Sequence, residues 1–465
     1  MNAGTKRLAV MAAACLSAWC GGARAQPLSA AATATTHSTM AGAAPAAIPG
    51  TTPAAAPGST SPTTPLATPT TPIDLAAAIR LALEQPGLRA AALEVAASEA
   101  ALTQAASHPN PELAYLREGQ DAGSRTTTIQ VNQAIELGGK RRARLALAEG
   151  EAGLARSALA ARRREVRAEV IAAYYTLLVA EERQALAQAL GSLARQGVEV
   201  AAKRVAAGKI SPIDETKARL AALDASTELA QAGAELAVAR TRLGALLGKP
   251  AEAVTLVEGQ SAGMAAKLEL PELPPLAALL ARVTDAGDAG NIGDVGRARS
   301  QLAASQARAE VERSARVPDL TLSFGSQRVD GVGGHQAVFG VSVPLPLFNR
   351  NQGNLTAALR RSDKAREELA AAQLAGAAEL SAAHIRYGAA RSEALLLRQD
   401  VIPSARKAHA LTLKGFEAGK FAFLDVLDAQ RTWFQAQSRH AAAVLAAWRA
   451  YADIERLAGA VDPTH

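Results

Sequence analysis

Cysteine is almost absent from this sequence of 465 residues, because its two cysteines, Cys15 and Cys20, both lie near the N-terminus. Residues 1–25 have a positive start, an apolar run and a small-residue cleavage site at Ala23-Arg24-Ala25, which predicts a secretory signal peptide. Its removal would leave no thiol, which excludes disulfides, thiolate metal sites and cysteine nucleophiles from the exported chain. The alternative is a lipoprotein signal in which Cys15 or Cys20 is acylated.

Aromatic residues and long apolar runs are also scarce. Aromatic residues make up 3 % of the chain, whereas hydrophobic residues make up 49 % and are dominated by alanine. Small side chains favour closely packed helices over one large spherical core. No apolar run of 18 or more residues follows the signal peptide, which argues against a helical membrane anchor.

Charge and residue spacing point away from several functional classes. The net charge of +7 comes from 50 Lys+Arg against 43 Asp+Glu, with both signs mixed along the chain, which is not typical of a nucleic-acid-binding protein. The sequence has no Gly-rich phosphate loop, nucleophile elbow or acid pair with catalytic spacing. No two of its seven histidines are three or four residues apart, as zinc ligands on a helix would be. We therefore expect neither an enzyme nor a bound metal or other cofactor.

Proline and small residues fill the segment that follows the signal peptide. Prolines recur every three to five residues from Pro45 to Pro72, so residues 26–72 are predicted to be an extended, disordered linker. The remainder is predicted to be a duplication, with repeats at 73–250 and 275–460, a connector at 251–274 and a tail at 461–465.

Three matches within the sequence indicate this duplication. Pro111-Glu112-Leu113 matches Pro318-Asp319-Leu320, Ala207-Gly208-Lys209 matches Ala418-Gly419-Lys420, and Asp214 matches Asp425. The last two matches have an offset of 211 residues, and the first has an offset four residues shorter. We expect a hairpin loop to absorb this difference.

Hydrophobic periodicity predicts the same elements in each repeat: a short helical stretch, two strands around a polar loop, a very long helix, a Gly-Lys break and a last helix. In the first repeat these lie at Leu75–Ala106, Glu112–Arg117, Thr126–Leu137, Lys140–Ala206 and Pro212–Leu247. In the second they lie at Gly293–Arg316, Leu320–Arg328, Gln336–Leu347, Gly353–Ala418 and Leu424–Ala458. The last helix of the first repeat also has a heptad pattern of a coiled-coil seam, formed by Ala225, Leu229, Ala232, Leu236, Ala239, Leu243 and Leu246.

The strand-like runs have about the length that crosses a bilayer when tilted, roughly 9 to 11 residues. Four strands alone would leave unpaired backbone groups in hydrocarbon, so the sheet is expected to close with strands from other copies. Three copies would supply twelve strands, enough to enclose water, whereas side chains would fill a barrel of eight. A continuous helix over Lys140–Ala206 would reach ~100 Å, which is suited to crossing a periplasm.

The junctions between strands and long helices have their own signals. Pro344 and Pro346 suit the end of a strand, and Asn351, with Asn349, could cap the helix that follows. Gly138-Gly139 would provide the equivalent bend in the first repeat. A basic cluster formed by Lys140, Arg141, Arg142 and Arg144 follows, either meeting anionic headgroups or forming a solvated helix face.

Two segments carry a resemblance to a known family. Ser342–Gly353 (SVPLPLFNRNQG) and Ala207–Lys217 (AGKISPIDETK) resemble the TolC family of outer-membrane efflux channels, and in particular its cobalt-zinc-cadmium (CzcC-like) branch. The similarity extends from Ile73 to Ala460. It implies a mainly α fold with membrane β structure, a homotrimer in which a 12-stranded β-barrel lies in the outer membrane and a coiled-coil α-barrel of 12 helices extends into the periplasm.

Asp425 and Asp428 are candidate gate residues. They are three residues apart, hence on one face at the start of a predicted helix, where a carboxylate can serve simply as a cap. The resemblance implies a second role, because aspartates at these positions constrict the periplasmic entrance of the family's channels, and a ring of carboxylates attracts cations. Asp214, the counterpart in the first repeat, is a gate candidate for which a helix cap is the simpler interpretation.

The two Gly-Lys breaks are candidate docking sites for a periplasmic adaptor, through Gly208, Lys209, Gly419 and Lys420. Termination of a helix by glycine explains the glycines without any partner. The basic residue that interlocks this tip in the family has no obvious match here, because Phe421 and Phe423 occupy its neighbourhood.

The resemblance implies an outer-membrane channel that extends into the periplasm and belongs to a tripartite efflux system. Its expected partners are further copies of itself, a periplasmic adaptor, an inner-membrane pump of the resistance-nodulation-division class and outer-membrane lipid. The CzcC-like motifs favour divalent cations of Co, Zn, Cd or Ni as cargo. The alternatives are a channel for drugs or secreted peptides and, in another class, a periplasmic coiled-coil adaptor without membrane strands.

Overall fold

The computed structural model describes residues 72–119, 125–256, 269–284, 293–331 and 333–459, all of which belong to one compact unit. The predicted signal peptide, the 461–465 tail, all but the last residue of the predicted linker and the middle of the connector lie outside the described residues.

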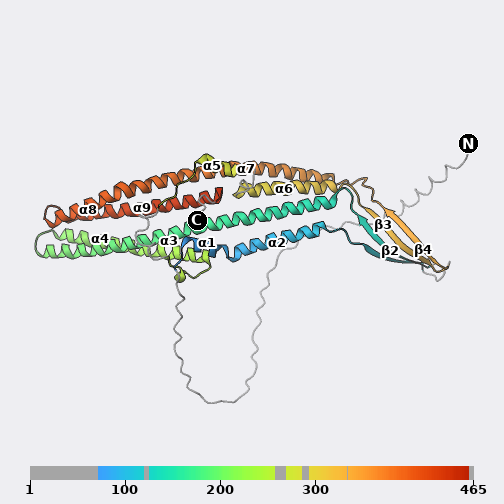
Figure 1. The fold of residues 1–465 in the computed structure, drawn as a ribbon. Coiled ribbons are helices and arrows are strands. Elements are labelled where there is room, and N and C mark those ends of the chain that lie inside the picture. The colour runs from blue at the N-terminus through green and yellow to red at the C-terminus, as the bar shows by residue number, and fades with distance from the viewer. Residues whose placement is uncertain (1–71, 120–124, 257–268, 285–292, 332, 460–465) are drawn as a thin grey trace, which may run out of the picture. The chain divides into compact units, whose positions relative to one another are not determined.

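Both repeats contain the predicted elements (Figure 1). The first comprises helices α1 (Leu75–Leu83) and α2 (Pro86–Ala106), strands β1 (Glu112–Glu118) and β2 (Thr126–Ile135), and helices α3 (Lys140–Ala206) and α4 (Pro212–Leu247). The second comprises α5 (Leu276–Thr284), α6 (Gly293–Ser314), β3 (Leu320–Val329), β4 (His335–Ser342), α7 (Gln352–Leu396), a π-helical turn (Leu397–Val401), α8 (Ile402–Glu417) and α9 (Phe423–Ala458). A short 3-10 turn at Ala251–Ala253 follows α4. The bounds of α3 and α4 are those that the sequence predicts.

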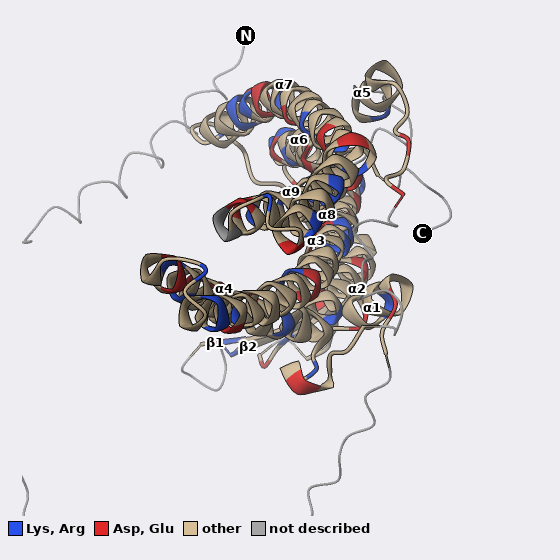
Figure 2. Ribbon diagram, turned by 90° about the vertical axis from the view of Figure 1, so that its left-hand side faces the viewer, with Lys and Arg blue, Asp and Glu red and all other residues tan. Residues whose placement is uncertain are grey.

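The long helices lie side by side, with the sheet at one end and the α3–α4 and α8–α9 turns at the other (Figure 1). Helix α3 packs against α2, α4, α6 and α9, and α7 packs against α6 and α9. Lysines, arginines and acidic residues are interspersed along these helices when they are viewed end-on (Figure 2). No helix in the described part of the chain is both long and apolar enough to cross a membrane.

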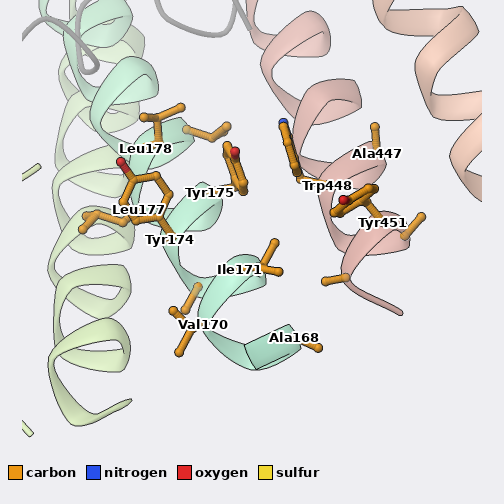
Figure 3. Packing of buried hydrophobic residues seen from close by; sticks show 14 of the residues in the cluster. Ala168, Val170, Ile171, Tyr174, Tyr175, Leu177, Leu178, Ala447, Trp448 and Tyr451 are labelled. Carbon is orange, nitrogen blue, oxygen red and sulfur yellow. The ribbon is translucent and has the colours of Figure 1, made fainter. Parts of the chain in front are cut away.

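The principal core joins the two repeats through α3 and α9 (Figure 3). Here the Tyr175 and Trp448 rings stack with centroids 3.9 Å apart and an interplanar angle of 10°. The Trp448 ring also meets Tyr451 edge-on, at 5.4 Å. A partly buried ion pair joins the same helices, because Arg167 Nε lies 2.9 Å from Glu455 Oε2 and the Tyr451 hydroxyl donates to the same carboxylate at 3.1 Å. The two repeats are thus held together by specific contacts as well as by small side chains.

The predicted seam on α4 is largely confirmed. Its alanines and two of its leucines are buried, namely Ala225, Ala232, Ala239, Leu236 and Leu243. Leu229 and Leu246 are half-buried. Small residues on this face allow α4 to approach α3 closely along its length.

Proline accounts for two departures from the predicted bounds. Strand β4 ends at Ser342, short of the predicted Leu347, because Pro344 and Pro346 have no N–H to pair with a neighbouring strand. The predicted continuous helix Gly353–Ala418 is interrupted by the π-helical turn immediately before Pro403, which cannot donate to the carbonyl four residues earlier. Beside this turn, burial and then the positive charge of Arg398 lower the pKa of His440.

The difference in length between the repeats lies at the strand-to-helix junction, not in a hairpin loop. Strand β2 ends at Ile135 and α3 begins at Lys140, whereas β4 ends at Ser342 and α7 begins at Gln352. The segment between β3 and β4 is shorter than that between β1 and β2. The expectation that a hairpin loop absorbs the difference is therefore wrong. The extra residues lie between β4 and α7, in the proline-containing segment 343–351.

Candidate functional site

The four strands form one antiparallel sheet in the order β1-β2-β3-β4. Cross-strand pairing places side chains in rows, one of which consists of Leu113, Val131, Phe324 and Phe339. Because side chains alternate along a strand, residues two positions from this row lie on the same face of the sheet. The sheet therefore has two faces that can be compared directly.

One face of the sheet is apolar and the other is polar. Large exposed side chains gather on the apolar face: Leu113, Tyr115, Ile129, Val131, Phe324, Phe339 and Val341. The opposite face carries small or uncharged polar side chains over most of its area, including Thr128, Gln130, Asn132, Ser323 and Gln327. These polar residues on β2 and β3 are half-buried while their apolar neighbours are exposed, which identifies the polar face as the concave one. This is the arrangement of a barrel wall with lipid outside and water inside.

The sheet is open at both edges. Within the described residues, β1 and β4 each pair with a strand on one side only. An apolar outer face requires lipid, and unpaired backbone groups are too costly in lipid, so these edges require strands from other copies.

Charged side chains link residues next to β2 and β3 to the helices α2 and α3. Lys140 Nζ lies 2.7 Å from Asp319 Oδ1, and Arg144 pairs with Glu136 and donates to Ser107 O at 3.2 Å. Arg141 Nε donates to Ala106 O at 2.6 Å. Three members of the predicted basic cluster therefore hold this junction together. Arg141 and Arg142 are also exposed, as a solvated helix face would be, and contact with headgroups stays a prediction.

The second junction uses asparagine differently from the prediction. Asn351 has a left-handed backbone with φ 56° and makes no side-chain cap to α7. Its Nδ2 donates instead to Glu312 Oε2 at 2.7 Å and to Glu312 O at 3.0 Å, and Asn349 Oδ1 accepts from Asn351 N at 3.0 Å. Asn351, predicted to cap α7, therefore links the proline-containing segment to α6 by hydrogen bonds.

Glycine is required at the first junction. Gly138 and Gly139 have φ values of 71° and 74°, and a Cβ on Gly138 would lie 2.6 Å from Val317 Cβ, whereas one on Gly139 would meet open space. We expect Gly138→Ala to destabilise the protein by about 2–4 kcal/mol, from left-handed strain plus overpacking. Gly139→Ala, the matched control, should cost only the strain, about 1–2 kcal/mol. Thermal unfolding of the two purified variants would check this, and equal melting temperatures would contradict the role of the Val317 contact.

The two Gly-Lys breaks have the same backbone geometry. Gly208 and Gly419 have φ values of 64° and 73°. Lys209 N donates to Arg204 O at 2.9 Å and Lys420 N donates to Gly415 O at 2.7 Å, so each break closes its helix with a left-handed glycine cap. All four candidate docking residues are exposed at the ends of the helical hairpins.

The three candidate gate aspartates begin α4 and α9. Asp425 is exposed, and its Oδ2 accepts from Ala422 N at 2.9 Å, which caps α9. Asp428 is exposed one turn later and lines a groove between α4 and α9. Asp214 is half-buried in the first turn of α4, where the Ser211 hydroxyl accepts from Ile213 N at 3.4 Å. Of the described residues that line the groove, Asp428 is the one predicted gate residue.

The groove is lined by apolar side chains and by charges of both signs. Its lining includes the apolar residues Leu190, Leu220 and Phe434 and the charged residues Lys217, Asp224, Glu228, Asp428, Arg431 and Arg439. Within the described residues, no three His, Cys, Asp or Glu side chains are grouped so that they could hold a metal ion.

A contact that sequence reasoning missed joins the two hairpin tips. The Arg204 guanidinium carbon lies 3.8 Å from the centroid of the Phe416 ring, a cation–π contact between the last turns of α3 and α8. Phe416 also belongs to a small buried cluster with Ala201, Ala218 and Val426, which come from the other three helices at this end. The pattern of a cation in the last helical turn was visible in the sequence, but its aromatic partner is a residue of the other repeat.

The sheet and the helical hairpins are the two parts of a known type of channel. The family described as "Outer membrane efflux protein" matches residues 78–249 and 290–460, well over half of the chain. The chain belongs to this family. It is 41 % identical over 389 residues to the cobalt-zinc-cadmium resistance protein CzcC of Cupriavidus metallidurans, covering 83 % of this chain and 90 % of the relative. It is 30 % identical to the nickel and cobalt resistance protein CnrC of the same organism, covering 70 % and 71 % of the two chains.

The solved structure of an outer membrane channel has the same fold. The MtrE outer membrane channel of Neisseria gonorrhoeae, in its open state, superposes with a TM-score of 0.67 at 20 % identity, covering 83 % of this chain and 88 % of that one. The resemblance to the TolC family and its CzcC-like branch is thus confirmed, as is the fold class of α-barrel and trimeric β-barrel.

As an outer membrane efflux protein, the chain is a channel of the outer membrane that extends into the periplasm. Channels of this family form trimers and work with an adaptor and an inner-membrane pump. This result argues against the alternative of a periplasmic coiled-coil adaptor, since the family that matches is one of outer membrane efflux proteins.

Proposed function

We propose that this outer membrane efflux protein exports divalent heavy-metal cations such as Co, Zn, Cd or Ni. The observation that carries the proposal is the identity with the cobalt-zinc-cadmium resistance protein, which extends through both repeats. The name of the nickel and cobalt resistance relative supports the same class of cargo.

The channel in this proposal is a passive duct. The side chains on its concave wall are mainly small or uncharged. Among the described residues, no group of side chains is suited to retaining a metal ion. Weak binding suits conduction, because an ion that binds tightly in a pore leaves it slowly. Selection of the metal and the driving force then belong to an inner-membrane pump of the resistance-nodulation-division class.

The adaptor docks, in this proposal, at the two Gly-Lys breaks. Gly208, Lys209, Gly419 and Lys420 are exposed at the helix turns farthest from the sheet, which is where a periplasmic protein can reach them. The Arg204–Phe416 contact lies beside both turns and links the two hairpins there.

The gate in this proposal is formed by Asp425 and Asp428, which threefold symmetry would turn into rings of three carboxylates. The cap that Asp425 provides to α9 uses one of its oxygens, Oδ2, so capping and gating are compatible. Asp214 lies deeper, in the first turn of α4, and in this proposal it stabilises the start of that helix and is not part of the carboxylate rings.

Metal and drug susceptibility of a deletion strain tests the cargo. We expect loss of the gene to sensitise the host to Co, Zn, Cd or Ni more than to hydrophobic antibiotics, and the plasmid-borne gene to restore resistance. A plasmid copy lacking the β3–β4 hairpin is the control that should fail to complement. Greater sensitisation to antibiotics would instead support the alternative, a channel for drugs or secreted peptides.

A further inference from the structure

A row of basic residues crosses the sheet at the end nearest the hairpin loops. Arg117 pairs with Thr127, Thr127 with Arg328, and Arg328 with His335, so the row contains one residue from each strand. Three of its four members are basic. Arg117 and Arg328 are 211 residues apart in the sequence, and the strand register brings them into one row.

The row lies on the convex, apolar face of the sheet. Its members are two positions from the row that contains Tyr115 and Ile129, and therefore point to the same side. Arg117, Arg328 and His335 are exposed. Arg328 Nε lies 3.7 Å from Asp330 Oδ1, and His335 Nδ1 lies 3.4 Å from Ser326 Oγ. Both distances are longer than those of strong charge-assisted hydrogen bonds, about 2.7–2.9 Å.

Positive charge predominates on the convex face at this end, and Asp330, two positions from Arg328, lies on that face as well. Glu118, the neighbour of Arg117, has the parity of the concave face, while Arg117, Arg328 and His335 have that of the convex face. The positive charge is therefore directed away from the water-filled interior and toward whatever surrounds the barrel.

The basic row lies just beyond the apolar band. Successive rows on one face are about 7 Å apart along a strand, and the apolar band occupies the rows from Leu320 and Ile135 to Tyr115 and Ile129. The basic row is four row spacings from the row of Ile135 and Leu320, which is about 27 Å along the strand and about 21 Å in height at a strand tilt of about 40°. The row therefore lies at the edge of an apolar band about 25 Å tall, from which long arginine side chains reach the headgroups. Because the helices extend into the periplasm, this end of the sheet faces the outer leaflet.

We propose that Arg117, Arg328 and His335 bind the phosphate groups of the anionic glycolipid of the outer leaflet. The planar guanidinium fork matches a phosphate with two parallel hydrogen bonds, and phosphate is the anion present at this depth. Threefold symmetry makes the row a basic girdle around the barrel, with three arginine pairs and three histidines. This inference goes beyond the cargo proposed above and does not depend on it.

Lipid titration of the full-length trimer in detergent tests the girdle. Wild type and an Arg117→Gln, Arg328→Gln, His335→Gln variant are titrated with diphosphoryl lipid A, monophosphoryl lipid A and phosphatidylethanolamine, and bound lipid is counted by native mass spectrometry. We expect the variant to bind diphosphoryl lipid A about 30-fold more weakly, the effect of two arginines near an anionic surface. Arg360→Gln with Arg361→Gln on α7, the matched control, should bind as wild type does.

The remaining lipids, added salt and a lysine variant distinguish phosphate binding from damage to the fold. Wild-type binding should weaken from diphosphoryl to monophosphoryl lipid A and fall with added salt. Arg117→Lys with Arg328→Lys should bind more weakly than wild type and more tightly than the triple variant, because the charge is kept and the guanidinium fork is lost. Unchanged lipid A binding by the triple variant, or binding by wild type that salt and phosphate number do not alter, would overturn the proposal. Equal loss of phosphatidylethanolamine binding would also overturn it, since damage to the apolar face would then be the cause.

Should the triple variant fail to form trimers, the salt and phosphate series on wild type still decides. Metal resistance is expected to remain in every variant that forms trimers, so failure here is distinct from failure of the proposed cargo.

Discussion

Replacing Trp448 with alanine is expected to lower the free energy of unfolding by about 3–5 kcal/mol, the usual cost of truncating a buried aromatic side chain. Trp448 is 3 % exposed, stacks on Tyr175 of α3 and meets Tyr451 edge-on within α9 (Figure 3). The truncation would open a cavity at the contact that joins the two repeats. Loss of this contact should also weaken assembly, because each subunit must present both repeats in a fixed relation.

Trp448→Phe is the matched control for this effect. The indole Nε1 is buried, and within the described residues it has no hydrogen-bond partner. Phenylalanine keeps an aromatic ring for stacking and removes the unpaired donor, so we expect a loss below about 1.5 kcal/mol. Thermal unfolding followed by circular dichroism at one protein concentration would measure both variants. Equal melting temperatures for Trp448→Ala and wild type would show that the stack contributes little.

Long periodic segments made most of the fold predictable from the sequence. Helices α3 and α4 begin and end at the predicted residues, because glycine and proline mark the ends of uninterrupted apolar patterns. The four strands were predictable from a different signal, because alternating side chains and polar loops define each of them. The need for further copies followed from the physics of open sheet edges in lipid.

Contacts between the repeats could not be predicted. Arg204 and Phe416 lie in different repeats, and neither has a spacing pattern that identifies the other as its partner. The basic row of the sheet likewise depends on the pairing of β2 with β3, which are separated by the whole of α3 and α4. The π-helical turn had a local signal, Pro403, but the sequence does not show that the turn lies against α9.

The candidate gate residues were partly predictable. Their position at helix starts followed from the sequence, and the structure places Asp425 as a cap, Asp428 on the groove and Asp214 in a half-buried first turn. What the sequence alone could not separate is a capping role from a gating role, because both require a carboxylate at the same helix terminus.

Neutralising both proposed gate residues distinguishes these roles. In the trimer, Asp425→Asn with Asp428→Asn removes six carboxylates, and we expect the concentration of multivalent cation that blocks single-channel current to rise by on the order of tenfold or more. Asparagine keeps a side-chain oxygen that can accept from Ala422 N, so the cap on α9 is preserved and the change in block reports charge. Planar-bilayer recording of the purified trimer would measure it.

Two further variants complete the gate test. Asp214→Asn removes three carboxylates at the start of α4, outside the groove, and should leave the block close to that of wild type. Asp425→Ala removes both the charge and the cap, and should in addition destabilise the start of α9 by about 1 kcal/mol. If the double asparagine variant is blocked as strongly as wild type, Asp425 and Asp428 serve as helix-start residues alone. Control of the entrance would then be assigned to the contact that holds the hairpin tips together, Arg204 with Phe416.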